Sequence, residues 1–135
     1  TPLYDNTLVL LSEVLAKSQE AANAGCPVRT ITLIVTDGHD EHSKYAGASD
    51  VAKVVHDMLM TEQHIIAGMG IDDRGRTDFK QAFRDMGIRD EWILTPGNTP
   101  HEIRKAFAVF SRSAVRASQS AVSFSQTAIG GFAAP

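Results

Sequence analysis

The chain has 135 residues, of which 43% are hydrophobic, and this length suits one compact domain. Its 13 Lys and Arg residues against 16 Asp and Glu residues give a formal net charge of -3, with neither sign gathered into a block that would follow a phosphate backbone. No apolar run approaches the ~18 residues of a membrane span, and no secretory signal pattern is visible. We therefore expect a soluble protein that binds no nucleic acid and does not span a membrane.

The first predicted element is a helix. Thr1-Pro2 has the order of an N-cap followed by a first helical residue. Leucines then recur at three- and four-residue steps, and a stretch with Gly25 and Pro27 ends the pattern. The spacing predicts an amphipathic helix over about residues 2–23.

Three strand–helix units are predicted after this helix. Residues 30–36 are β-branched and apolar, which favours a strand covered on both faces. A polar loop over 39–49 leads to a helix that Ser49 or Asp50 is expected to cap. Residues 64–71 predict a second buried strand, whose glycines allow another segment to approach closely.

The remaining elements are shorter or lie near the C-terminus. Thr77 or Asp78 is expected to cap a third helix, and residues 92–94 predict a brief strand. Thr99 and Pro100 repeat the cap-then-proline signal and open a last helix to about Ser118. Residues 1–118 are thus predicted as the domain. Residues 119–135 are interpreted as a small-residue tail, with docking and partial disorder as alternatives.

This alternation predicts an α/β fold: a doubly wound, Rossmann-like parallel sheet with helices on both faces. Three strands are few for such a sheet, and one apolar strand edge would stay unpaired, which folded proteins usually avoid. The fold is therefore expected to be incomplete at its N-terminal side. A further segment or a partner should supply the missing cover.

Asp37 is the first candidate functional residue. It follows a predicted buried strand, and open parallel sheets bind ligands at the carboxyl ends of their strands. A carboxylate buried there needs a cation or hydrogen-bond donors. The alternative is an ordinary Asp-Gly turn, and position alone does not separate the two.

Two motifs together resemble the von Willebrand factor type A family. The sequence Thr-Pro-Leu-Tyr-Asp at residues 1–5 opens a helix, and Ile-Thr-Leu-Ile-Val-Thr-Asp-Gly follows at residues 31–38; they resemble the family's second and third motifs. Residues 65–71 look like the family's next strand, and residues 91–94 and 103–118 look like its last strand and helix. The resemblance spans residues 1 to about 118.

The resemblance implies a metal-dependent adhesion site at the top of the sheet. A Mg²⁺ or Mn²⁺ ion would be bound by the Thr1 hydroxyl and the Asp37 carboxylate, directly or through water, with an open position for an acidic residue of a partner protein. The loops 39–44 and 72–76 would form the contacting surface. The candidate partner-binding residues in them are His39, Asp40, Glu41, His42, Asp72 and Asp73.

The chain departs from the family at the first motif. Asp-x-Ser-x-Ser occurs nowhere in these residues, so an aspartate and two serine ligands are missing. Thr1 and Asp37 alone cannot define a tight magnesium site. We therefore expect the metal, and the strand beside residues 30–36, to depend on an N-terminal fragment of the same domain or on another chain.

Other functions fit these residues less well. The spacing of His39 and His42 is wrong for a helical zinc motif, and Asp72, Asp73 and Asp78 lack the regular spacing of a calcium loop. A metal-independent assembly role stays open. A self-processed hydrolase with Thr1 as its N-terminal nucleophile is a further alternative. A helix directly after Thr1 suits a cap better, so a protein that is not an enzyme is favoured. The single cysteine, Cys26, leaves no internal disulfide, which favours a cytoplasmic protein.

Overall fold

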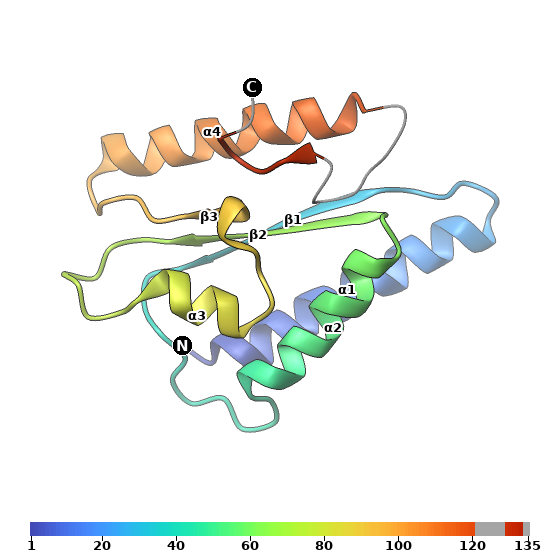
Figure 1. Ribbon diagram of the computed structural model, residues 1–135. Coiled ribbons are helices and arrows are strands. Elements are labelled where there is room, and N and C mark those ends of the chain that lie inside the picture. Colours follow the sequence, from blue (N-terminus) through green and yellow to red (C-terminus); the bar gives the residue numbers. More distant parts are fainter. Residues whose placement is uncertain (121–128, 134–135) are drawn as a thin grey trace.

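The computed structural model describes residues 1–120 and 129–133 (Figure 1). Four α-helices, one short 3-10 helix and three strands occur in this part of the chain. In chain order they are α1 (Leu3–Asn23), β1 (Thr30–Thr36), α2 (Ala48–Met60), β2 (His64–Gly70), α3 (Phe79–Asp85), η1 (Asp90–Trp92), β3 (Ile93–Leu94) and α4 (Pro100–Ser118). The predicted succession of one helix and three strand–helix units is confirmed.

The three strands form an open parallel sheet in the order β1-β2-β3. β1 and β2 pair along their whole length, from Thr30 opposite His64 to Thr36 opposite Gly70. β3 is only two residues long and pairs Ile93 with Gly68. The chain therefore has the mixed α/β architecture that the sequence predicts, and β1 forms one edge of the described sheet.

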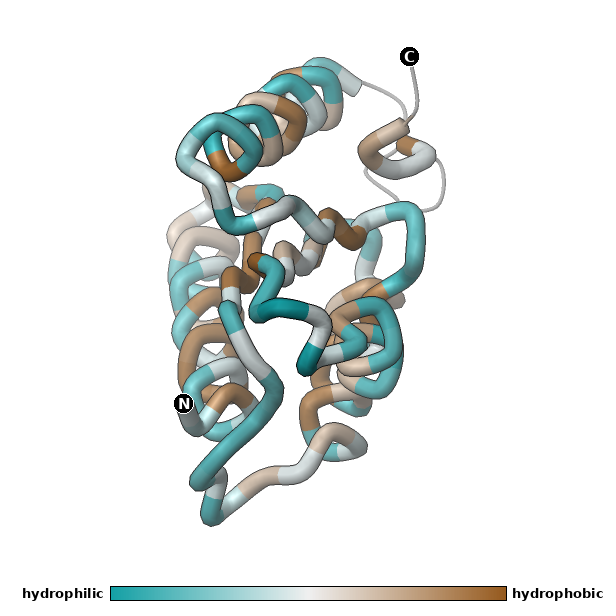
Figure 2. Tube along the Cα trace, turned by 90° about the vertical axis from the view of Figure 1, so that its left-hand side faces the viewer, coloured by the Kyte–Doolittle hydropathy of each residue, from teal (hydrophilic) through white to brown (hydrophobic). Residues whose placement is uncertain are grey.

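The helices are distributed unevenly around this sheet. In Figure 1, α1, α2 and α3 lie below the sheet and α4 lies above it, and Figure 2 shows the same layers from the side. All seven residues of β2 are buried, whereas β1 alternates between buried and partly exposed residues. None of the helices in the described residues is both long and apolar enough to cross a membrane.

The starts of α1 and α2 differ from the sequence prediction. Thr1 does not cap α1 with its side chain; the Tyr4 amide instead donates to an Asp40 carboxylate oxygen at 2.9 Å, so the cap comes from 36 residues away. α2 begins at Ala48, so Asp50 lies inside the first turn and accepts from the Gly47 amide at 2.9 Å. Neither Ser49 nor Asp50 is therefore the N-cap residue.

The starts of α3 and α4 follow the prediction. The Asp78 carboxylate accepts from the Gln81 amide at 3.1 Å, and the Thr99 hydroxyl accepts from the Glu102 amide at 3.2 Å. Both caps satisfy amides that no preceding helical turn could satisfy. Local sequence signals suffice at these two helices because the capping side chain lies next to the helix that it caps.

The glycines of β2 allow α3 to pack closely on the sheet. A side chain on Gly68 would place its first carbon 2.7 Å from the Phe83 ring, and one on Gly70 would overlap the Phe79 ring. Both rings are buried. The close approach expected at these glycines is thus made by two aromatic side chains of the following helix.

Part of the predicted tail lies against the domain. The Phe132 ring packs edge-on against Trp92, with ring centroids 5.2 Å apart, and against Phe110 at 6.3 Å. The Phe132 amide donates to the Glu91 carbonyl oxygen at 2.9 Å. Residues 129–133 therefore dock beside α4 and η1. The rest of the predicted tail after residue 120 lies outside the described residues.

Candidate functional site at the carboxyl end and open edge of β1

Asp37 directly follows β1 at the carboxyl end of the sheet. The Thr36 hydroxyl donates to the Gly38 carbonyl oxygen at 2.7 Å and accepts from the Gly38 amide at 3.3 Å, which fixes the turn that carries Asp37. The Asp37 side chain is exposed, and no group in the described residues donates a hydrogen bond to it. It is therefore free to bind a ligand from solvent.

The start of α1 is joined to the loop that follows Asp37. The Glu41 amide donates to the Thr1 carbonyl oxygen at 2.8 Å. The Asp5 amide donates to the Ser43 hydroxyl at 3.1 Å, next to the Asp40 cap already described. The start of α1 thus lies beside the loop that follows Asp37, and the Thr1 side chain is exposed there.

Asp5 binds the second half of this loop, residues 44–46, through hydrogen bonds. Its carboxylate accepts from the backbone amides of Lys44, Tyr45 and Ala46 at 2.7, 3.1 and 2.9 Å. These bonds, led by the Lys44 amide, lower the pKa of the Asp5 carboxyl below its ordinary value. The loop is consequently preorganised, and the Tyr45 side chain projects from it with 91% of its surface exposed.

The loop after β2 is stabilised mainly by its own aspartates. Asp72 accepts from the Gly75 amide at 3.1 Å, and Asp73 accepts from the Thr77 amide at 3.0 Å and from the Thr77 hydroxyl at 2.5 Å. The bond from the Thr77 hydroxyl is the main reason that the pKa of Asp73 is lowered. His39 approaches this loop, with Nδ1 3.5 Å from the Thr77 hydroxyl.

The predicted contact residues therefore divide into two groups. The carboxylates of Asp40, Asp72 and Asp73 already accept hydrogen bonds from backbone amides, Asp40 at the start of α1 and the other two within the loop after β2. The other contact residues, His39, Glu41 and His42, are exposed, as is the predicted ligand Asp37, and His39 Nε2 lies 3.7 Å from the Glu41 carboxylate. No cluster of three or more His, Cys, Asp or Glu side chains that could hold a metal occurs among the described residues.

A small polar cavity of about 410 Å³ lies at the carboxyl ends of β2 and β3. Its lining mixes acidic, basic and hydroxyl side chains, with Asp72, Thr77, Lys80 and Thr95 among them. Of these four, Asp72 is among the contact residues that the sequence predicts. The cavity arises because the loops after β2 and β3 meet, where the Asp72 amide donates to the Pro96 carbonyl oxygen at 3.0 Å.

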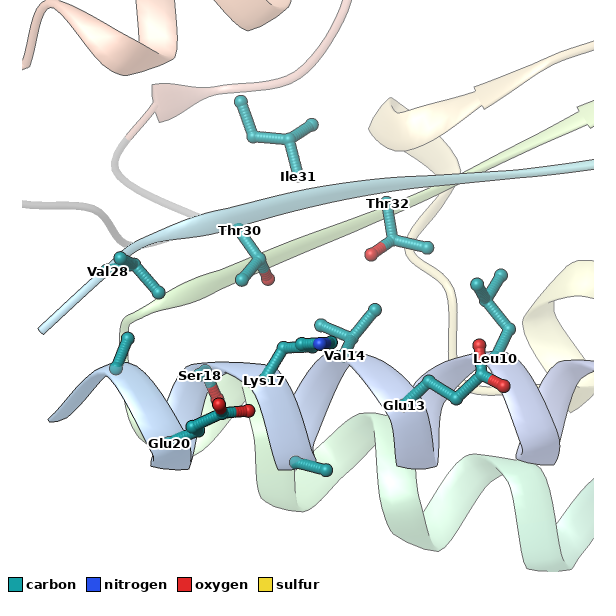
Figure 3. A pocket seen from close by; sticks show the side chains of 12 residues that line it. Leu10, Glu13, Val14, Lys17, Ser18, Glu20, Val28, Thr30, Ile31 and Thr32 are labelled. Carbon is teal, nitrogen blue, oxygen red and sulfur yellow. The ribbon is translucent and has the colours of Figure 1, made fainter. Parts of the chain in front are cut away.

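A larger groove of about 870 Å³ runs between α1 and the open edge of β1 (Figure 3). Leu10, Val14 and Val28 give it an apolar lining, and Figure 3 shows Thr30 and Thr32 directed toward α1. Charged side chains of α1 line it as well, namely Glu13, Lys17 and Glu20. The sequence predicted a bare edge but not this groove, because its two walls come from separate elements.

The backbone of β1 also faces the open edge. The Thr30 amide donates to Gln63 and the Thr36 carbonyl accepts from Ile71, at 2.8 and 2.9 Å, so these end residues turn toward β2. Alternate residues of a parallel strand face opposite neighbours. The intervening odd-numbered residues therefore direct their amides and carbonyls outward, where the described sheet has no further strand; they are Ile31, Leu33 and Val35.

Comparisons with protein-family models, with curated proteins and with solved structures found no match to this chain.

Proposed function

We propose that the chain is the carboxyl-terminal portion of a doubly wound domain similar to von Willebrand factor type A, and that it acts as a metal-assisted protein-binding module. Thr1 and Asp37 would supply two oxygen ligands to Mg²⁺ or Mn²⁺ at the carboxyl end of β1. The observation that carries the proposal is the 2.8 Å hydrogen bond from the Glu41 amide to the Thr1 carbonyl oxygen, because it joins the first of the two motifs to the loop that directly follows the second.

The arrangement of the helices sets a condition on this location. Ligands of open α/β sheets bind where neighbouring strands send their following helices to opposite faces. In Figure 1, α2 and α3, which follow β1 and β2, lie on the same side of the sheet, whereas α4, which follows β3, lies on the other side. Within the described sheet such a crevice lies at β2 and β3, where the cavity of about 410 Å³ is found, and a crevice at Asp37 requires a further strand on the open side of β1.

The proposed partner at this edge is a strand supplied by an N-terminal segment of the same domain or by another chain. The outward amides and carbonyls of Ile31, Leu33 and Val35 would pair with it, and the apolar groove beside α1 would receive its side chains. This strand would also bring the ligands that Thr1 and Asp37 cannot supply, since Mg²⁺ usually takes about six oxygens including waters.

The metal proposal is tested on the reassembled domain. The chain is mixed with a polypeptide that carries an apolar strand ending in Asp-x-Ser-x-Ser and a following helix, and melting is followed with magnesium or with EDTA. Magnesium at about ten times its Kd should add about 1.4 kcal/mol to stability. Asp37→Ala should abolish this gain, while Asp57→Ala, at an exposed position on α2, should keep it. Equal melting with magnesium and EDTA would show that the metal function is absent.

A metal-independent assembly role is the second candidate, and the groove with its open backbone favours it. Val35→Lys places a charge on an exposed position of the edge strand, at 43% exposure, and should prevent assembly. Val9→Lys, at 59% exposure on α1 and outside the groove, is the matched control. The assembly role replaces the metal role if Val35→Lys blocks association but Asp37→Ala leaves it unchanged.

A further inference from the structure

A buried histidine lies where β1 and β2 begin, at the end of the strands opposite to Asp37. His64 is the first residue of β2 and pairs in register with Thr30, the first residue of β1. Only 2% of its surface is exposed, and its Nδ1 lies 2.6 Å from the Thr30 hydroxyl oxygen. Thr30 itself lines the groove between α1 and β1 (Figure 3). One hydrogen bond therefore connects a titratable ring to the wall of the proposed docking groove.

This setting favours the neutral form of the ring. Burial lowers the pKa of His64 below its ordinary value, because the imidazolium ion loses its hydration there. Charged or titratable side chains do occur on the surrounding elements: Lys17 and Glu20 on α1, His56 and Asp57 on α2, Arg29 before β1 and Glu62 before β2. Burial, rather than any of these charges, is the cause of the lowered pKa.

We propose that protonation of His64 loosens the amino-terminal end of β1 and thereby makes the groove, and the docking of a strand at its edge, sensitive to acid. The inference rests on the proposed completion of the β1 edge and adds its regulation. An imidazolium ion at this position needs hydration, so either water must enter or the ring must leave its buried position. The hydrogen bonds of β1 should open before those of β2, because in the described sheet β1 has a neighbouring strand on one side only.

The direction of the pH effect follows from the lowered pKa. An unfolded or opened His64 binds a proton at a pH of about 6.5, whereas the buried ring binds one only at lower pH. The closed state is therefore fully favoured above about 6.5, and this advantage falls as the pH decreases toward the pKa of the buried ring. Acid should thus open the groove, and neutral pH should close it.

The test combines imidazole titration by NMR with amide hydrogen exchange between pH 5 and pH 7.5. The His64 ring should titrate below the ordinary imidazole pKa of about 6.5. After correction for intrinsic rates, exchange of the Thr30 amide, bonded to Gln63, should be at least tenfold faster at pH 5 than at pH 7.5. The Ile71 amide, bonded to Thr36 at the other end of β1, is the internal control and should change less.

Two variants complete the experiment. His64→Asn retains a side chain that can bond to Thr30 but does not titrate, so its Thr30 exchange should become independent of pH; His56→Asn should behave as the unaltered chain. A His64 ring that titrates at a pH of about 6.5 or above, or a pH effect equal at Thr30 and Ile71, would overturn the inference. These readings use the chain without magnesium or a partner, so a failed metal or assembly test leaves them interpretable.

Discussion

β1 and β2 have the same length and run in register, yet they differ in their surroundings. Both are seven-residue apolar strands, and every residue of β2 is buried between its neighbours. Among the described residues, β1 has a neighbouring strand on one side only, and its Val35 is 43% exposed. A strand with the composition of a central strand thus occupies an edge. This difference is the basis of the proposed completing strand.

The largest expected effect comes from truncating matched isoleucines on the two strands. Ile65 and Ile31 are opposite each other in register, but Ile65 is fully buried and Ile31 only partly. Ile65→Ala should cost about 2–5 kcal/mol in the free energy of unfolding. Ile31→Ala should cost about 1 kcal/mol or less. Urea unfolding measures both, and equal costs would mean that β1 is already covered in solution.

Gly70→Ala tests the packing that makes β2 central. The added methyl group would overlap the Phe79 ring, so the ring or the strand must shift. Overpacking of this kind costs about 1–3 kcal/mol. Gly38→Ala is the matched control, because its added carbon would meet no atom within 4 Å. A Gly70→Ala chain as stable as the control would show that α3 does not pack on β2 as described.

A smaller effect on stability is expected at Asp5, whose carboxylate binds the loop after β1. Asp5→Asn replaces one carboxylate oxygen with a side-chain NH₂ group, which faces backbone N–H donors and cannot accept from them. The substitution should lower the melting temperature at neutral pH, but by less than Gly70→Ala does. The pKa of Asp5 is lowered by folding, so its contribution is present at neutral pH and is lost as the pH falls below about 4. The Asp5→Asn difference should therefore shrink in acid, whereas Asp57→Asn should show no difference at either pH.

The parts of the fold that could be predicted are those with local signals. Thr99, Pro100 and Asp78 lie next to the helices that they start, and residues 30–36 carry their apolar pattern within one strand. The count of three strands also sufficed to predict an open edge. These features follow from neighbouring residues in the sequence, so no tertiary information is needed.

The errors and omissions arise where partners are distant in the sequence. Asp40 replaces Thr1 as the cap of α1 from 36 residues away, and Asp5 binds amides 39 to 41 residues away. The donors in the second case are backbone groups, which leave no trace in the residue pattern. The groove and the His64–Thr30 bond likewise depend on how separate elements pack. Asp37 and Thr1 remain candidate ligands, since their exposure is known but their metal binding is a prediction.

Sedimentation velocity combined with thermal unfolding at micromolar concentration tests the central claim most directly. If β1 requires a neighbouring strand, the chain alone should self-associate or unfold without a single cooperative transition. Adding a polypeptide that supplies the strand should then give a one-to-one complex with cooperative melting. A chain that is monomeric and unfolds cooperatively without any partner would contradict the account.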